Sequence, residues 1–255
     1  LMGSAVCAAG DVNGDGYGDV IVGARSFDNG ESNEGRTYIF EGSAAGIATS
    51  AAWSTGSNQP GAELGYAVGS AGDVNGDGAA DLAVGGTDRW TWWNTNQGYE
   101  TSMVSSSIFF SVSSLSGDYD LSDGDVQFTD SAGGLGAGRI HVGADFDGDG
   151  NDDVIVSDYS AQDYSQGGWG GNSGYEDNGR SGVYYFDGGD LSAGSYDLDP
   201  GDSLDGDDGS TDSLFYLLEA DSYNYLGHSL ASSDTDGNGS TDLVAFAAPG
   251  SSSYA

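Results

Sequence analysis

DVNGDGYGD, the stretch Asp11–Asp19, is the most informative part of this sequence because it recurs three more times. The other copies are DVNGDGAAD at Asp73–Asp81, DFDGDGNDD at Asp145–Asp153 and DTDGNGSTD at Asp234–Asp242. Each copy carries oxygen-bearing side chains at positions 1, 3, 5 and 9 and a glycine at position 6. Calcium takes about six to eight oxygen ligands, and a tight turn at glycine lets one short loop supply most of them. The repeat therefore predicts up to four Ca²⁺ sites.

The loop differs from the calcium loop of helix–loop–helix proteins, which needs a glutamate at position 12 between two helices. Position 12 here falls inside apolar runs and is occupied by Val22, Val84, Val156 and Ala245. An aspartate at position 9 closes the loop instead, and the variable residue at position 7 fits a ligand that is a backbone carbonyl. The fourth loop has Asn238 where the others have Asp at position 5, so we expect it to be the weakest site.

Short apolar runs follow the loops and predict buried strands. The runs are Val20–Ala24, Leu82–Gly86, Val154–Val156 and Leu243–Phe246. Further strands, each opened by glycine, are expected at Gly35–Phe40 and Ser181–Phe186. Two related acidic segments, Ser114–Asp125 and Asp190–Asp202, are expected to form an outer strand and a loop. No long stretch carries helical periodicity, so the chain is predicted to be all-β.

The spacing of the loops indicates a repeat architecture. The loops begin at residues 11, 73, 145 and 234 and are therefore 62, 72 and 89 residues apart. Repeats of this size with several short strands each are typical of a β-propeller or a related array. The growing spacing indicates insertions, which we expect at Asp88–Ser107 and Asp158–Gly179.

A larger unit surrounds the loop and resembles a known family. It reads Leu-Gly, then Ala-Gly-Asp-Val-Asn-Gly-Asp-Gly, then Asp-Leu-Ala-Val-Gly-Gly, and is similar to the FG-GAP repeat of the integrin α-subunit β-propeller and its bacterial relatives. The likeness is closest in the first two repeats, departs at Asp147 and Ser157 in the third, and is weakest in the fourth. It implies one domain over residues 1–255, made of four-stranded blades. The expected units are 1–63, 64–134, 135–225 and a partial 226–255, giving about three to four blades.

In that family the calcium loop connects two strands of a blade. The resemblance implies side-chain ligands at positions 1, 3, 5 and 9 and a backbone carbonyl at position 7. In this chain the implied ligands are Asp11, Asn13, Asp15, Tyr17 and Asp19; Asp73, Asn75, Asp77, Ala79 and Asp81; Asp145, Asp147, Asp149, Asn151 and Asp153; and Asp234, Asp236, Asn238, Ser240 and Asp242.

Four loops are too few for the ring of usually seven blades that the family builds. The first and last residues also stand at the same phase of the repeat, so the fourth unit lacks its outer strands. Open strand edges are avoided in natural proteins. We therefore expect either a segment of a larger propeller or a chain whose edges are covered by another copy, as in a filament or surface layer.

Composition limits the partners. The formal net charge is −36, from 41 acidic and 5 basic residues, which disfavours nucleic acid and anionic lipid. The single cysteine, Cys7, excludes an internal disulfide and is expected to be buried as a small apolar residue. No window is apolar enough to insert into a membrane, and calcium loops of modest affinity fill outside the cell. An extracellular or cell-surface location is expected.

Catalysis has little support in the sequence. His141 and His228 stand at strand and packing positions, and no nucleophile motif, zinc cluster or phosphate loop is present. Aromatic residues in the two insertions are better candidates for contact with a protein or carbohydrate ligand, or for covering blade edges. These residues are Trp90, Trp92, Trp93, Tyr99, Tyr159, Tyr164, Trp169 and Tyr175. We expect a non-catalytic adhesion or ligand-binding module. The alternatives are a filament subunit and the propeller of a polysaccharide lyase or phosphodiesterase.

Overall fold

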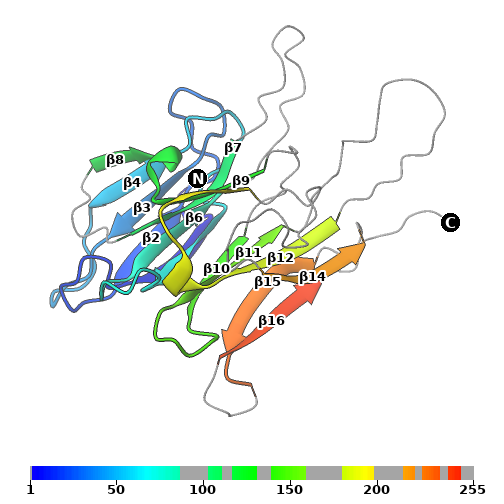
Figure 1. Ribbon diagram of the computed structural model, residues 1–255. Coiled ribbons are helices and arrows are strands. Elements are labelled where there is room, and N and C mark those ends of the chain that lie inside the picture. The colour runs from blue at the N-terminus through cyan, green and yellow to red at the C-terminus, as the bar shows by residue number, and fades with distance from the viewer. Residues whose placement is uncertain are drawn as a thin grey trace, which may run out of the picture.

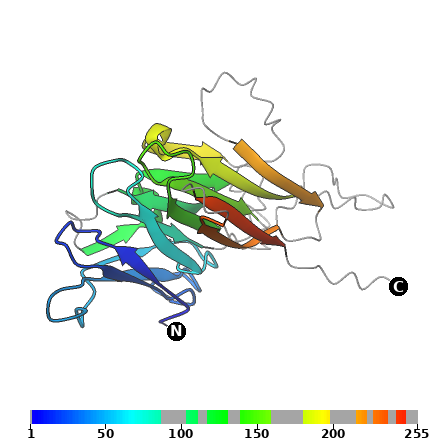
Figure 2. The same cartoon turned by 90° about the horizontal axis from the view of Figure 1, so that it is seen from below.

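The computed structural model describes residues 2–86, 103–110, 117–130, 139–158, 180–197, 215–221, 226–235 and 241–247. Within these ranges the chain is all-β, as predicted, and its helical segments are two short 3₁₀ turns, η2 (Leu121–Asp123) and η3 (Gly188–Asp190). Neither turn is long or apolar enough to cross a bilayer. The strands form three multi-stranded sheets and one hairpin, which follow each other in chain order (Figures 1 and 2).

Each multi-stranded sheet contains an antiparallel four-stranded blade. In every blade the acidic loop joins the first strand to the second, and the predicted apolar run forms the second strand. The first blade has β1 (Ala5–Gly10), β2 (Asp19–Gly23), β3 (Arg36–Phe40) and β4 (Trp53–Gly56). The second has β5 (Ala67–Gly72), β6 (Asp81–Gly85), β7 (Met103–Phe109) and β9 (Val126–Asp130). The third has β10 (Arg139–Ala144), β11 (Asp153–Asp158), β12 (Arg180–Phe186) and β14 (Phe215–Asp221). The hairpin has β15 (Leu226–Ser233) and β16 (Asp242–Ala247).

Two short strands depart from the prediction for the acidic segments. β8 (Gly117–Asp120) and β13 (Gly194–Asp197) do form strands, but neither is the outer strand of its own blade. β8 runs parallel to β4 of the first blade, and β13 runs parallel to β9 of the second. Each therefore extends the sheet of the preceding repeat, a pairing between residues too far apart in sequence for local patterns to indicate.

The blades stack face to face, with the first strands β1, β5, β10 and β15 side by side in this order. One apolar core lies between the first and second blades and includes Ile21, Trp53 and Leu82. A second core lies between the second and third blades and includes Phe128, Val154 and Phe186. Burial of these faces against each other is the main source of stability expected for a repeat array.

Two predictions are corrected by this arrangement. Cys7 is exposed rather than buried, and its neighbour Val6 is 64% exposed. The reason is the position of β1 at the edge of the first sheet, since an edge strand is covered only where another sheet packs on it. The insertion expected at Asp88–Ser107 also extends too far, because residues from Met103 onward belong to β7.

Candidate metal centre

The first three acidic loops share one backbone path. A β-bulge ends the first strand before each loop, between Ala8 and Gly10 in the first blade. Glycines at positions 4 and 6 then take left-handed conformations, with φ of +70° at Gly14 and +89° at Gly16 in the first loop. Because residues with a Cβ rarely adopt this region, the two glycines let the chain coil tightly enough to bring the side chains at positions 1, 3 and 5 to one side.

Hydrogen bonds fix these three side chains in the first loop. The backbone N–H of Asp15 donates to Oδ1 of Asp11 at 2.9 Å and to Oδ1 of Asn13 at 3.0 Å. The N–H of Gly16 donates to Oδ2 of Asp11 at 2.7 Å, and that of Tyr17 donates to Oδ1 of Asp15 at 2.9 Å. The second and third loops repeat this pattern at the matching residues. The oxygens are thus held in place by the protein before any ion binds.

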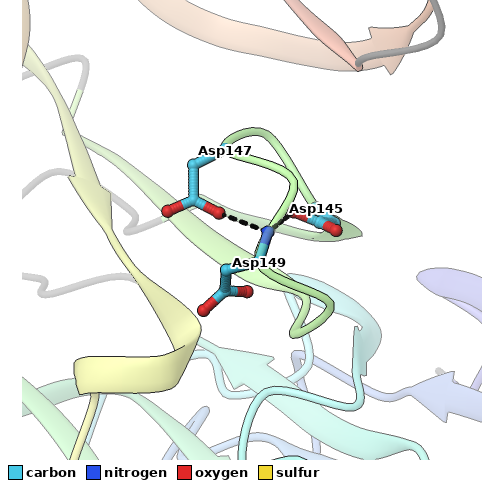
Figure 3. Close-up of side chains that lie close together, drawn as sticks. All are labelled: Asp145, Asp147 and Asp149. Atoms are coloured by element: carbon cyan, nitrogen blue, oxygen red, sulfur yellow. Dashed lines mark hydrogen bonds between the residues drawn. The ribbon is translucent and has the colours of Figure 1, made fainter.

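The third loop shows how closely the oxygens approach. One carboxylate oxygen from each of Asp145, Asp147 and Asp149 lies within 4.8 Å of the others, and all three residues surround the backbone N–H of Asp149 (Figure 3). Carboxylates this close repel each other in the absence of a cation. Their hard oxygen donors, partly exposed to solvent, fit the chemistry of Ca²⁺ rather than that of zinc.

The aspartate at position 9 has a different setting. Asp19, Asp81 and Asp153 are almost completely buried, with exposed fractions of 2% or less. Oδ2 of Asp19 accepts from the N–H of Val12 at 3.0 Å, and its Oδ1 accepts from the N–H of Gly42 at 2.7 Å. In the third loop, the Asp153 carboxylate accepts in the same way from the backbone N–H of Phe146 at 2.7 Å and from the backbone N–H of Gly188 at 2.9 Å. Each of these two carboxylates therefore ties the start of its loop to the end of the third strand.

Burial sets the protonation behaviour of this position. Desolvation raises the pKa of Asp19 and of Asp153, while the backbone N–H donors oppose the rise. The Tyr185 hydroxyl, which hydrogen-bonds Asp153, has its own pKa raised by burial and by that carboxylate. Because each carboxylate oxygen has two lone pairs, the backbone bonds leave acceptor capacity for an ion.

Sequence reasoning missed the partners of position 9. Gly42 and Gly188 each stand two residues after the last residue of the third strand of their blade. A Cβ added at Gly42 would lie 2.2 Å from the Gly18 carbonyl oxygen, and one added at Gly188 would lie 2.1 Å from the Asp152 carbonyl oxygen. Only glycine allows this approach, so the Phe-Glu-Gly and Phe-Asp-Gly endings of β3 and β12 were the available signal. Asp187 was also missed. Burial and the charge of Asp147 raise the pKa of its carboxyl beside the third loop.

Neighbouring loops also contact each other. The N–H of Ala80 in the second loop donates to the Asp11 carbonyl at 3.1 Å, and the N–H of Asp152 in the third donates to the Asp73 carbonyl at 3.1 Å. The Asp152 side chain adds a bond from the N–H of Asp73 at 2.9 Å. Position 8 of one loop is thus bonded to position 1 of the loop before it.

Several predicted site residues lie outside this description. Among the predicted ligands of the fourth loop, the described ones are the exposed Asp234 and the backbone of Asp242, while Asp236, Asn238 and Ser240 fall outside the described residues. The same holds for the aromatic residues of both insertions. Calcium coordination by the side chains at positions 1, 3, 5 and 9 and by the backbone carbonyl at position 7 stays a prediction. His141 and His228 lie in β10 and β15 as expected, but their side chains are not described.

Comparison with known proteins supports the repeat assignment. The family model described as FG-GAP repeat matches residues 2–40. Integrin alpha pat-2 of Caenorhabditis briggsae is 39% identical over 88 residues, covering 33% of this chain and 7% of that protein. The Caenorhabditis elegans protein of the same name is 38% identical over 88 residues, with the same shares covered. Integrin alpha-4 of Xenopus laevis is 35% identical over 84 residues, covering 32% of this chain and 8% of that protein.

The chain therefore spans less than a tenth of the length of these relatives. The likeness nevertheless agrees with the antiparallel blades and with the loop that joins the first two strands of each. The family match at residues 2–40, the partial likeness to integrin α-subunits and the all-β blades together support an FG-GAP repeat, integrin α-like propeller.

Proposed function

We propose that the chain is a calcium-stabilised, extracellular β-propeller module of the adhesion type, which binds a partner and does not catalyse. The observation that carries the calcium part is the identical arrangement of the first three loops. In each, three side chains at positions 1, 3 and 5 are held on one side of a glycine turn by the same backbone hydrogen bonds.

Calcium would be held by the oxygens at positions 1, 3 and 5, with position 9 and the carbonyl at position 7 completing the set. An ion there would neutralise the repulsion among the carboxylates and lock the connection between the first two strands. The contacts between successive loops would pass this stabilisation along the array. Because a metal that binds only the folded state adds its binding free energy to folding, calcium should raise stability strongly.

The adhesion part rests on similarity to integrin α-subunits, which supports a protein partner at the cell surface or in the matrix. A carbohydrate partner is also compatible with the aromatic insertions. Trp90, Trp92, Trp93, Tyr99, Tyr164 and Trp169 are the residues we propose for this contact. An extracellular location agrees with calcium loops of modest affinity, which fill where free calcium is high.

The calcium proposal is tested by calorimetric titration and by thermal unfolding with calcium or with chelator. Calcium at 100 times the dissociation constant of one site adds about 2.7 kcal/mol to the free energy of unfolding. For a chain of this size this raises the melting temperature by about 5–11 °C. Asp149→Asn keeps the acceptor for the Asn151 N–H but removes one charge, so it should weaken one site in calcium, and it should not lower the melting temperature in chelator, where it relieves repulsion among the carboxylates. Asp147→Asn is the milder matched change, since Asn13 and Asn75 already occupy that position in the other loops. Equal melting temperatures with calcium and with chelator would refute the proposal.

A further inference from the structure

The outer edges of the blades are joined by strands that cross from one repeat to the next. β8 of the second repeat adds to β4, and β13 of the third repeat adds to β9, both in parallel (Figure 1). The two donor segments have related sequences, GDYDL at 117–121 and GSYDL at 194–198. The same sequence type thus performs the same pairing twice.

An aromatic cluster accompanies each crossing strand. Tyr119 of β8 stacks on Trp53 of the first blade at 6.0 Å between ring centroids, and Trp53 meets Phe109 of the second blade edge-on at 5.1 Å. In the next pair of blades, the ring centroid of Tyr196 in β13 lies 6.2 Å from that of Phe128 and 5.6 Å from that of Phe186. Each cluster combines the outer strand of one blade with the third strand and the crossing strand of the next. We call a crossing strand with its cluster an outer-edge latch.

Polar contacts fix the register of the first latch. Asp118 accepts from the Ser54 hydroxyl at 2.8 Å and forms a salt bridge with Arg36. Asp120 accepts from the side-chain amide of Asn58. In the second latch the Thr129 hydroxyl donates to the Tyr196 carbonyl at 3.3 Å. The segment is therefore held by backbone, aromatic and polar contacts together.

The third blade repeats the receiving side of this arrangement. Its outer strand β14, drawn orange in Figure 2, pairs with β12 and with no other strand in the described part of the chain. In the backbone register, Phe215 of β14 is paired with Tyr185 of β12. Trp53 of β4 is paired in the same way with Ile39, the equivalent residue of β3. An aromatic residue thus occupies the register position of Trp53 on an outer strand that, like β4 and β9, runs antiparallel to the third strand of its blade.

We propose that the outer edge of β14 binds, as a parallel strand, the Gly-Xaa-Tyr-Asp-Leu segment of a further repeat of this kind. The two copies in this chain are already engaged by β4 and β9, and their linkage within one chain gives them a high effective concentration there. A second copy of this chain therefore offers no spare segment, which favours a separate repeat as the occupant. Strand addition at an edge supplies backbone hydrogen bonds for affinity and side-chain contacts for specificity.

The experiment uses the intact chain with synthetic GDYDLSDG, the sequence of residues 117–124, at about 1 mM in calcium. Amide hydrogen exchange is followed over β4, β9 and β14, and sedimentation reports the association state. We expect slower exchange in β14 alone and binding that is at least about tenfold weaker for the peptide with alanine in place of tyrosine. Phe215→Ala should weaken binding of the parent peptide, with circular dichroism checking that the variant folds.

Three results would overturn the proposal. If β14 exchanges at the same rate with and without peptide, the edge does not accept the segment. The alanine peptide could bind as well as its parent, which would remove the role of the aromatic cluster. Protection of β14 that depends on chain concentration alone would identify a second copy as the occupant. None of these results depends on calcium affinity, so the proposal can fail while the calcium function stands.

Discussion

Removing the carboxylate of Asp19 should destabilise the protein even when calcium is absent. Asp19 is 2% exposed and accepts hydrogen bonds from the backbone N–H groups of Val12 and Gly42. In Asp19→Ala both donors lose their partner inside the protein. An unsatisfied buried donor costs about 1–3 kcal/mol, so the pair costs about 2–6 kcal/mol. For a chain of this size the melting temperature should fall by about 4–24 °C.

Two further variants separate this structural role from metal binding. Asp19→Asn keeps one acceptor oxygen and should lose about half of the stability that Asp19→Ala loses. Asp15→Asn is the matched control, because Asp15 is exposed and its amide replacement still accepts from the Tyr17 N–H. In chelator this control should stay within about 0.5 kcal/mol of the parent protein, whereas in calcium it should lose the stabilisation of one site.

Thermal unfolding of the four proteins with calcium and with chelator is the assay, and circular dichroism follows the loss of β structure. The reasoning fails if Asp19→Ala unfolds in chelator within about 2 °C of the parent protein, a shift equal to less than one lost hydrogen bond. It fails equally if Asp15→Asn and Asp19→Ala behave alike in chelator, because position 9 would then act only through the ion.

Three further predictions concern packing, pH and the outer-edge latch. Gly23→Ala should cost at least about 1–3 kcal/mol, since an added Cβ would lie 2.1 Å from the Gly65 carbonyl oxygen, whereas Gly18→Ala meets nothing within 4 Å and serves as its control in urea unfolding. Calcium-free protein should melt at a higher temperature near about pH 5 than at about pH 7. The pKa values of Asp19 and Asp153 are raised in the folded protein, so their contribution to stability is full below pH 3.8, the ordinary pKa of aspartate, and is lost as the pH rises through the folded-state pKa values. Equal melting temperatures, or a higher one at about pH 7, would contradict this. Tyr196→Ala should lower stability by about 1–3 kcal/mol and increase amide exchange in β9, while Tyr196→Phe, which keeps the ring contacts, should change exchange little.

The loops and the strands that follow them could be predicted because their signals are local. Four nonapeptides with fixed glycines and acids, each followed by an apolar run, specify a turn and a buried strand within about 14 residues, in keeping with the length of short strands and loops. β2, β6 and β11 lie where the runs indicate, and β3 and β12 match the two glycine-opened strands to within one residue at their starts.

Features that depend on distant partners could not be predicted. β1 reads AVCAAG, which carries no strong strand signal, and its exposure is set by which faces other sheets cover. Position 9 was expected only as a ligand because its partner Gly42 lies 23 residues away in sequence. The pairing of β4 with β8 joins residues 64 positions apart, and nothing in either segment indicates that it is parallel.

The loops and the latches secure different parts of a blade, and this division has a consequence for calcium. The loops connect the first two strands and touch each other through backbone bonds such as Ala80 to Asp11. The latches hold the fourth strand through aromatic and backbone contacts that contain no calcium ligand. Removing the ion should therefore loosen the inner strand pair while the outer edge stays paired. Under the two proposals made above, calcium would keep the inner strands ordered, and the sequence-related crossing strands would determine which repeats can join at the outer edge.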